Sequence, residues 1–451
     1  MRAIDVAELI IPGLFPKGVG HVACIVSLAD GKTMMTDLAV TIMMGSKIRP
    51  VMSKAFELEK EFRKVGNYWE LKDKNNPLGI HRRIQILDKN GLIAGIYNSR
   101  GGAYSRLGQQ TKAIAENTKA IKLNPKFAGA YNNRGIAYHD LHQLDRALSD
   151  YDCAIELNPN FAEAYNNRGG VYGDLGQHTK AISDFNKAIE LDANYAEPYN
   201  NRGNAYDKLG QLTKGISDYT KAIQLNPKYA DAYYNRGIVY SESAQYTKAI
   251  SDYTKVIELN PKFAKAYNNR GTVYYELGQY TKALSDYTKE IQLNPGEVDA
   301  YCNRGVTYYV LGKYQEAISD FNNAIELNPK FAEAYFNRGS AYYDLGQRNK
   351  AIYDYTKAVG LNPNDAEAYK SRGYAYLNSQ RYTQAASDYT QAIKLNPKDD
   401  RAYANRGLAY ALSEKPEKAK KDLLRAVKLN PSLKAYVMEI SDQFKLDLQL
   451  D

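Results

Sequence analysis

In this chain of 451 residues, His21 and Asp37 have side chains and a spacing that could serve catalysis. They lie in two apolar or alternating runs that flank Asp30-Gly31. An Asp-Gly pair between such runs predicts a β-hairpin, here within residues 21–39, with the histidine and the aspartate on its two strands. Cys24 falls on the same predicted strand as the histidine, so we do not expect it to be a nucleophile that this histidine activates.

Other chemistry-bearing motifs are missing from the sequence. It has no P-loop, no G-x-G-x-x-G after a predicted strand, and no cysteine or histidine pairs with zinc spacing. His139 and His142 have no further ligand nearby, and they are interpreted as surface residues. Cys24, Cys153 and Cys302 are too far apart to indicate a disulfide framework. We therefore expect a non-catalytic protein with no catalytic residue, no metal and no cofactor.

The amino-acid composition indicates a globular chain in which one sequence unit is repeated. Hydrophobic residues make up 44% and charged residues 25%, which excludes wholesale disorder. Lys and Arg number 60 against 51 Asp and Glu, and 40 tyrosines stand against 11 phenylalanines and one tryptophan. Acidic residues interrupt the apolar start of the chain, and no uncharged run reaches the roughly 20 residues that span a bilayer. We therefore expect no signal peptide, no membrane segment and a cytoplasmic location.

One sequence unit recurs ten times over residues 94–433, and its first copy spans 94–127. When each copy is numbered from 1 to 34, position 8 is Gly and positions 4 and 11 are Tyr in all ten. In the second copy Tyr131, Gly135 and Tyr138 are spaced as one face of a first helix. Asn-Pro at positions 31 and 32 ends the second helix in most copies, because proline cannot continue a helix. The ten repeats begin at Ala94, Ala128, Ala162, Ala196, Ala230, Ala264, Val298, Ala332, Ala366 and Asp400.

The composition also predicts where the repeats begin and end. Residues 1–93 hold six of the seven methionines and the single tryptophan, whereas residues 94–433 contain no methionine. We therefore predict an N-terminal segment of unknown function over residues 1–93, a repeat array over 94–433, and a C-terminal segment over 434–451. The apolar residues of the last segment have helical spacing, which predicts a capping helix that shields the final repeat.

This pattern resembles the tetratricopeptide repeat, a helix–turn–helix unit of about 34 residues. The resemblance implies an all-α fold over most of the chain, a right-handed superhelical solenoid in which neighbouring repeats bury one another's apolar faces. A small α/β or irregular segment would precede it. The resemblance further implies that the first helix of each repeat lines a concave groove and the second helix lies on the convex face. A chain of this kind is expected to be a protein-interaction scaffold.

A column of amides is predicted to line that groove. Position 6 is Asn in eight copies, and an amide that both donates and accepts suits the backbone of an extended peptide. The column resembles the asparagine ladder in the repeat array of O-GlcNAc transferase. The alternative is that each amide bonds the neighbouring repeat instead. The column comprises Asn133, Asn167, Asn201, Asn235, Asn269, Asn303, Asn337 and Asn405.

Acids and aromatic rings are predicted beside the column. Positions 2 and 13 are mostly acidic, as at Asp231 and Glu333, whereas positions 19 and 26 on the convex face are rich in lysine. Tyr275, Tyr309 and Tyr343 occupy position 12 of consecutive repeats and could anchor a ligand. We predict a basic or neutral, extended protein or peptide segment as the partner. The alternatives are that the charges are merely solvated and that the tyrosines are packing residues.

Two further positions carry charge in a regular way. Position 7 is Arg in all ten copies and position 23 is Asp in nine, which predicts a structural ladder of pairs such as Arg236 with Asp252. Glu290 departs from the rule that position 27 is small, and as a buried carboxylate it should reach solvent or find a base. Lys occurs at position 5 only at Lys370, so the clamp that some relatives use for chaperone carboxylate tails is not expected.

Two alternative functions remain open. His21 and Asp37 resemble the His–Asp half of a transglutaminase-like site, in which Asp orients His and His activates a Cys nucleophile. The resemblance implies a truncated or degenerate enzyme with a repeat array that docks its substrates, since no Cys precedes His21 in this sequence. The second alternative is RNA binding through the basic convex face. A nucleic acid is not our expected partner, and neither is a membrane.

Overall fold

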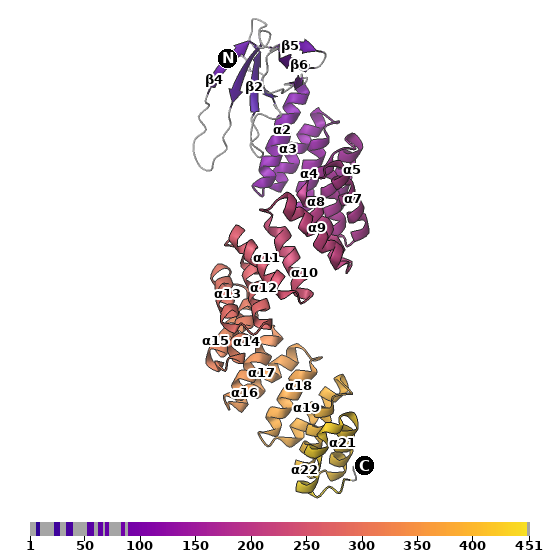
Figure 1. Cartoon of the computed structure of the whole chain (residues 1–451), viewed down its shortest axis with the longest axis vertical. Coiled ribbons are helices and arrows are strands. Elements are labelled where there is room, and N and C mark those ends of the chain that lie inside the picture. The colour runs from indigo at the N-terminus through magenta and orange to yellow at the C-terminus, as the bar shows by residue number, and fades with distance from the viewer. Residues whose placement is uncertain are drawn as a thin grey trace. The chain divides into compact units, whose positions relative to one another are not determined.

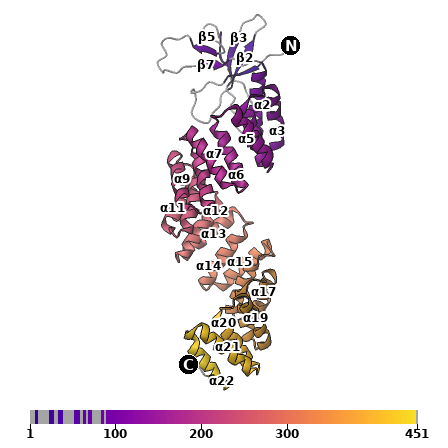
Figure 2. The same cartoon turned by 90° about the vertical axis from the view of Figure 1, so that its right-hand side faces the viewer.

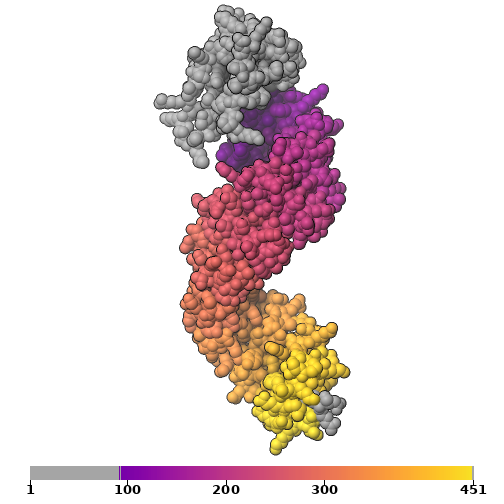
Figure 3. Space-filling model, in the orientation of Figure 1, coloured from indigo at the N-terminus to yellow at the C-terminus, as the bar shows by residue number. Residues whose placement is uncertain are grey.

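The computed structural model describes residues 89–448 and, within residues 1–88, the backbones of strands β1–β7. The chain divides into two compact units, Met1–Pro227 and Lys228–Asp451. Within each unit the helices follow one another as antiparallel neighbours, as Figures 1 and 2 show. In the space-filling view of Figure 3 the successive repeats of each unit appear as successive bands of colour.

The elements described before the repeats are antiparallel strands. One sheet has the order β1-β2-β3-β4 and a second has the order β5-β6-β7. β2 and β3 pair across the predicted turn, with Ala23 opposite Asp37. His21 lies outside the described residues, so its resemblance to half of a catalytic site stays a prediction. The strands are β1 (Val6–Leu9), β2 (Val22–Ser27), β3 (Thr33–Leu38), β4 (Met52–Glu57), β5 (Phe62–Val65), β6 (Tyr68–Leu71) and β7 (Arg83–Gln85).

The repeats of both units are helix pairs, which confirms the predicted all-α repeat fold. From the second repeat on, the first helix begins at position 1 and the second helix at position 17. The first unit contains α2 (Lys89–Arg106), α3 (Gln110–Leu123), α4 (Ala128–Asp140), α5 (Leu144–Leu157), α6 (Ala162–Asp174), α7 (His178–Leu191), α8 (Ala196–Lys208) and α9 (Leu212–Leu225).

The second unit continues the same alternation and ends in a further helix. Val437 and Ile440 on that last helix, α22, are buried against Ala419 and Leu423 of the final repeat. The helices are α10 (Ala230–Glu242), α11 (Tyr246–Leu259), α12 (Ala264–Glu276), α13 (Tyr280–Leu293), α14 (Val298–Val310), α15 (Tyr314–Leu327), α16 (Ala332–Asp344), α17 (Arg348–Leu361), α18 (Ala366–Leu377), α19 (Tyr382–Leu395), α20 (Asp400–Leu412), α21 (Pro416–Leu429) and α22 (Lys434–Phe444).

The turn between the two helices of a repeat requires a left-handed residue at position 15. Gly176 takes a φ of +70° there, which costs glycine little because it has no Cβ. Repeats without that glycine keep the conformation, since His142 has a φ of 55° and Ala244 a φ of 54°. The exposed His142 is therefore a turn residue, and the backbone geometry of the turn is maintained whatever its side chain.

Glycine at position 8 allows a ring from the second helix to lie directly on the first helix. A Cβ added at Gly305 would lie 2.7 Å from Cε1 of Phe321, and one added at Gly237 would lie 2.8 Å from Cε1 of Tyr253. Such distances are shorter than carbon atoms tolerate, so the close approach excludes any other residue. The ring at position 24 is buried by this contact, with Phe321 fully excluded from solvent.

An arginine at position 7 joins the two helices of the repeat and the repeat before it. Arg270 donates Nε to Oδ2 of Asp286 and Nη2 to Oδ1, both at 2.8 Å, and Nη1 to the hydroxyl of Thr254 at 2.9 Å. Its guanidinium also lies over the rings of Tyr267 and Tyr274, at 5.8 and 5.9 Å. The tyrosines at positions 4 and 11 thus flank the arginine, a role that their helical spacing alone did not indicate.

The predicted Arg–Asp ladder is present in both units. The same bidentate geometry recurs at Arg134–Asp150, Arg168–Asp184, Arg202–Asp218, Arg236–Asp252, Arg304–Asp320, Arg338–Asp354, Arg372–Asp388 and Arg406–Asp422. In the first repeat Arg100 Nε lies 3.1 Å from Oε2 of Glu116. Each carboxylate is buried, so the pair satisfies a charge that would otherwise be costly to remove from water.

Glu290 is buried at the small position of its repeat, and it neither reaches solvent nor finds a bonded base. Its side chain is 1% exposed, and Oε2 has no hydrogen-bond partner. In the first repeat Phe127, at position 34, packs against the cluster that contains Ala120 at position 27. In the sixth repeat position 34 is Glu297, and the absence of that ring leaves room for a longer side chain.

The surroundings of Glu290 favour its neutral form. Burial, and then the negative charges of Glu297 and Asp299, raise the pKa of Glu290 to about 8, while the ammonium of Lys265 partly opposes them. A carboxyl group whose pKa is raised on folding stabilises the fold at a pH below its unfolded value of 4.5 and loses that contribution as the pH rises through about 8.

We predict that Arg270→Met lowers the free energy of unfolding by about 3–5 kcal/mol, because Asp286 is then buried without a partner. The double variant Arg270→Met/Asp286→Leu should recover most of that loss, since no charge remains buried. Thermal unfolding and hydrogen exchange in α12 and α13 measure both effects. Lys282→Met removes an exposed cation from the ring of Tyr274 and should cost less than about 1 kcal/mol. A double variant as unstable as the single one would contradict this account.

We also predict that Glu290→Gln changes how stability depends on pH. Between pH 5.5 and 8 the wild-type chain should lose stability relative to this variant by roughly 1.4 kcal/mol per pH unit. Melting temperatures of the two proteins across this range provide the measurement, with the exposed Glu326→Gln as the matched control. Glu290→Met, which keeps the volume and removes the carboxyl group, should raise the melting temperature at pH 8. Parallel pH curves for wild type and Glu290→Gln would refute the burial argument.

Candidate functional site

Six of the amides at position 6 link their first helix to the preceding first helix of the same unit. Asn303 on α14 donates Nδ2 to Oδ1 of Asn268 on α12 at 3.1 Å, and the acceptor stands at position 5. Asn269 donates instead to the hydroxyl of Tyr234 at 3.1 Å, and Asn337 to the sulfur of Cys302 at 3.8 Å. The first unit repeats the pattern at Asn133–Asn98, Asn167–Asn132 and Asn201–Asn166, over 2.8, 3.0 and 3.1 Å.

The amide column therefore forms hydrogen bonds between neighbouring repeats, which is the alternative that the sequence left open. All eight amides, Asn235 and Asn405 included, are half-buried on the first helices, and we call the surface that they form in each unit the first-helix face. An amide has two N–H donors and a carbonyl oxygen with two acceptor positions, so one bond to the next repeat does not exhaust it. Whether a peptide uses the remaining capacity stays a prediction.

Position 12 carries side chains that reach the next repeat at position 13. Tyr309 donates its hydroxyl to Oδ2 of Asp344 at 2.6 Å, and His139 Nε2 lies 2.7 Å from Oδ2 of Asp174. Burial and then the hydrogen bond to Asp344 raise the pKa of Tyr309 above its usual value, so the phenol remains a donor at neutral pH. His139 is thus a half-buried residue with a carboxylate partner, where the sequence indicated only a surface histidine.

The three predicted tyrosines each lie against a second tyrosine. Tyr275 and Tyr309 contact Tyr280 and Tyr314, the first residues of their own second helices, with ring centroids 5.5 Å apart in both pairs. Tyr343 contacts Tyr374 from the next repeat at 5.6 Å. The rings therefore pack and yet stay half-exposed on the first-helix face, while Asp231 and Glu333 are exposed beside them.

A hollow of about 360 Å³ opens on the first-helix face of the second unit, across repeats 7–10. It brings together three predicted residues, Tyr309, Tyr343 and Asn405, from α14, α16 and α20. We call it the tyrosine hollow. The other lining residues are Ser340, Asp344, Tyr355, Glu367, Lys370, Ser371, Tyr374 and Arg401.

Two of these lining residues depart from the repeat pattern and were not predicted as site residues. Tyr374 at position 9 is 47% exposed, and no earlier repeat has an aromatic side chain at that position. Lys370 at position 5 binds Oε2 of Glu367 at 2.6 Å and Oδ2 of Asp399 at 3.0 Å. The sequence signal that could have identified these two residues is their departure from the repeat pattern, since a side chain that breaks the pattern indicates a local structural or functional constraint.

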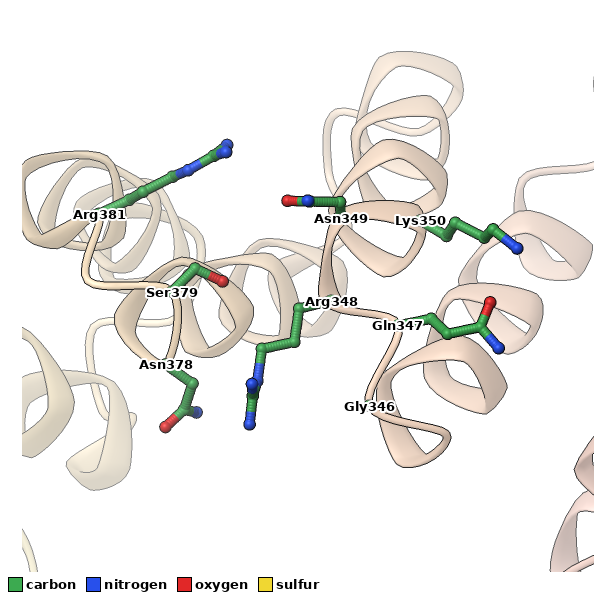
Figure 4. Close-up of a pocket in the computed structure, with 8 residues that line it drawn as sticks. All are labelled: Gly346, Gln347, Arg348, Asn349, Lys350, Asn378, Ser379 and Arg381. Carbon is green, nitrogen blue, oxygen red and sulfur yellow. The ribbon is translucent and has the colours of Figure 1, made fainter.

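A second hollow, of about 540 Å³, lies at the turns of repeats 8 and 9 and is rich in cations. Figure 4 shows Arg348 extending beside Asn378, whereas Gln347 and Lys350 point to the other side. Asn378 donates Nδ2 to the hydroxyl of Tyr343 at 2.9 Å, so this bond joins a lining residue of the second hollow to a lining residue of the tyrosine hollow. The remaining lining residues are Gly346, Asn349, Ser379 and Arg381, and the charged ones are exposed.

The lysines at position 19 of the second helices have a structural role in this fold. Lys282 at position 19 lies 5.2 Å from the ring centre of Tyr274 and binds the side-chain oxygen of Gln279 at 2.8 Å. The same contact with the ring occurs at Lys112, Lys180, Lys214, Lys248 and Lys350. Each of these lysines places its ammonium group over a tyrosine ring, which accounts for the lysines at position 19 without a polyanion.

Among the described residues no group of three or more His, Cys, Asp or Glu side chains could hold a metal ion. Nor does any helix in that part of the chain have the length and apolar character needed to cross a membrane.

Models of the tetratricopeptide repeat match the chain from residue 101 to residue 433 without a gap. Their matches are 128–161, 196–229, 230–263, 298–331, 332–365 and 366–399 for one model, 101–141, 171–210 and 271–312 for a second, 151–183 and 252–285 for a third, and 400–433 for a fourth. No curated protein matches the sequence.

Several solved structures are similar to parts of the chain. YrrB, described as a tetratricopeptide-repeat protein with an unusual peptide-binding site, is 30% identical over 41% of this chain and 95% of its own, with a TM-score of 0.37. A tetratricopeptide repeat protein from Parabacteroides merdae is 24% identical over 55% and 98%, with a TM-score of 0.43. Yeast Tom70 is 14% identical over 78% and 96%, with a TM-score of 0.38.

Proposed function

Because this chain belongs to the tetratricopeptide-repeat family, we propose that it is a non-catalytic scaffold that binds an extended protein segment along its first-helix face. The observation that carries the proposal is the tyrosine hollow, where half-exposed rings, charges and an amide converge from four successive first helices. Aromatic side chains are frequent anchors of protein interfaces, because they bury a large area at a small entropic cost.

The charges of the first-helix face favour a basic or neutral segment over an acidic one. Asp231, Asp299, Glu333 and Glu367 occupy position 2 along the second unit, interrupted by Lys265 and ended by Arg401. Like charges brought together at an interface are costly, so acidic tails should be repelled. Lys370, the cation that would begin a chaperone clamp, is already held by two carboxylates. A cytoplasmic location belongs to the same proposal, since the sequence has only three scattered cysteines.

The amide column would add bonds to the backbone of the segment. Six of the position-6 amides each donate one bond to the preceding repeat, which holds the plane of the amide in a defined orientation. A backbone N–H or C=O of the ligand can then meet the remaining acceptor or donor without reference to the ligand's sequence. Specificity would come from the places where the repeats differ, above all the tyrosine hollow.

We predict that Asn303→Ala weakens peptide binding by about 2- to 12-fold, the effect of losing one hydrogen bond. The probe is a library of random dodecapeptides displayed on phage and selected on the full chain, with the affinities of recovered peptides measured by fluorescence anisotropy. Asn268→Ala is the matched control, because it removes the same inter-repeat bond from the other side. Both variants should lose similar thermal stability, and only Asn303→Ala should lose affinity. If Asn268→Ala weakens binding equally, the column serves repeat stacking alone. If the full chain recovers no peptide, the proposed function is wrong.

A further inference from the structure

We propose that the tyrosine hollow is an arginine-binding pocket, which holds the guanidinium of one arginine of the bound segment. This inference rests on the proposed function and names the side chain that anchors the segment. The pocket would accept arginine in preference to lysine or to a neutral side chain of the same shape.

The aromatic surface of the pocket suits a planar cation. Tyr343 and Tyr374 lie with ring centroids 5.6 Å apart and planes inclined by 45°, so they form a bent aromatic wall. Tyr374 is 47% exposed, and Tyr309 lines the same hollow from the preceding first helix. A guanidinium stacks on such rings because the face of an aromatic ring carries partial negative charge.

The charges of the pocket are arranged unequally between its two sides. On the side of repeats 7 and 8, Asp344 accepts a bond from the uncharged hydroxyl of Tyr309, so its negative charge is not cancelled by that contact. On the side of repeat 9, Lys370 lies between Glu367 and Asp399, which together outweigh its charge. Two cations lie near these groups, since Arg401 lines the pocket from repeat 10 and Arg348 of repeat 8 interacts with the hydroxyl of Tyr343. Both would direct an incoming cation away from themselves and toward Asp344.

The interior of the same chain holds an arginine among the same kinds of group. Arg270 lies over two tyrosine rings and makes a bidentate contact with one aspartate. The pocket offers tyrosine rings and the carboxylate of Asp344. The arginine among its described lining residues, Arg401, comes from repeat 10. The planar fork of a guanidinium matches both a ring face and a carboxylate, whereas the compact ammonium of lysine matches only the charge.

The lining of the pocket also indicates where the rest of the segment would lie. With the guanidinium against Asp344, the backbone beside the arginine would lie over α20, where Arg401 and Asn405 can donate to backbone carbonyl oxygens. The arginine would then be anchored in repeats 7–9, and residues that flank it would lie over repeat 10. The anchor thus includes Tyr374, the one aromatic residue that the sequence has at position 9 of the repeats, which would make this part of the face selective.

The test uses the full chain and the same phage-displayed random dodecapeptides. Peptides recovered on the wild type should carry arginine at one fixed position, at least about 5-fold above its frequency in the unselected library, a modest enrichment for a charge-assisted contact. Synthetic copies of two recovered peptides are then compared with twins in which citrulline, the neutral isostere, or lysine replaces that arginine. The arginine peptides should bind at least about 10-fold more tightly than the citrulline twins.

Two variants and two controls connect the preference to the pocket. Asp344→Asn should reduce the arginine-to-citrulline ratio to less than about 3-fold, and Tyr374→Ala should weaken the binding of the arginine peptide about 5-fold or more. Glu326→Gln removes an exposed acid of the second helix α15, and Tyr353→Ala removes an exposed ring of the second helix α17, and neither residue lines the pocket. Both controls should keep the ratio of the wild type.

The outcomes separate this inference from the proposed function. Recovered peptides that lack arginine enrichment but weaken on Asn303→Ala would overturn the arginine pocket and leave the scaffold proposal standing. An arginine preference that survives Asp344→Asn would also overturn it, because the cation would then bind elsewhere. A chain that recovers no peptides overturns both proposals.

Discussion

The bidentate pair between arginine at position 7 and the carboxylate at position 23 is the contact on which the rest of each repeat depends. It sets the spacing of the two helices, and at that spacing the ring at position 24 touches the bare backbone of glycine at position 8. The same guanidinium fixes the tyrosines at positions 4 and 11 and reaches the previous second helix. A buried carboxylate without this partner would be costly, so the pair determines which helix packing is stable.

Because these positions maintain the repeat, binding specificity has to come from the others. Positions 2, 5, 9, 12 and 13 differ from copy to copy, and together with position 6 and Tyr355 at position 24 they line the tyrosine hollow. Position 6 stands between the two groups, since its amide bonds the preceding repeat and yet lies half-buried on the first-helix face. Lysine at position 19 belongs to the structural group, because it covers the tyrosine at position 11. The second helices are therefore less suited to recognition than their charge indicates.

The sequence predicted the helix pairs and the arginine ladder because both arise within one repeat, and ten copies of one pattern leave little ambiguity. It left the role of Asn303 open because its partner, Asn268, lies in the neighbouring repeat. Cys302, an acceptor for Asn337, shows that this partner need not be an amide. The tyrosine hollow was harder still to predict, because Tyr374 and Lys370 each depart from the repeat pattern only once. Whether they lie near Tyr309 and Asp344 depends on how three repeats stack.

The stability of a repeat array is a sum over neighbouring repeats, so single departures from the repeat pattern can persist. The unpaired carboxyl group of Glu290 weakens the packing of its own repeat, and the arginine pairs on either side, at Arg270 and Arg304, keep the regular geometry. The exposed ring of Tyr374 likewise affects one junction, while the adjacent Arg372 still makes its two bonds to Asp388. A regular inner ladder thus tolerates irregular side chains at its surface, and a binding site can be built within three repeats without redesign of the others.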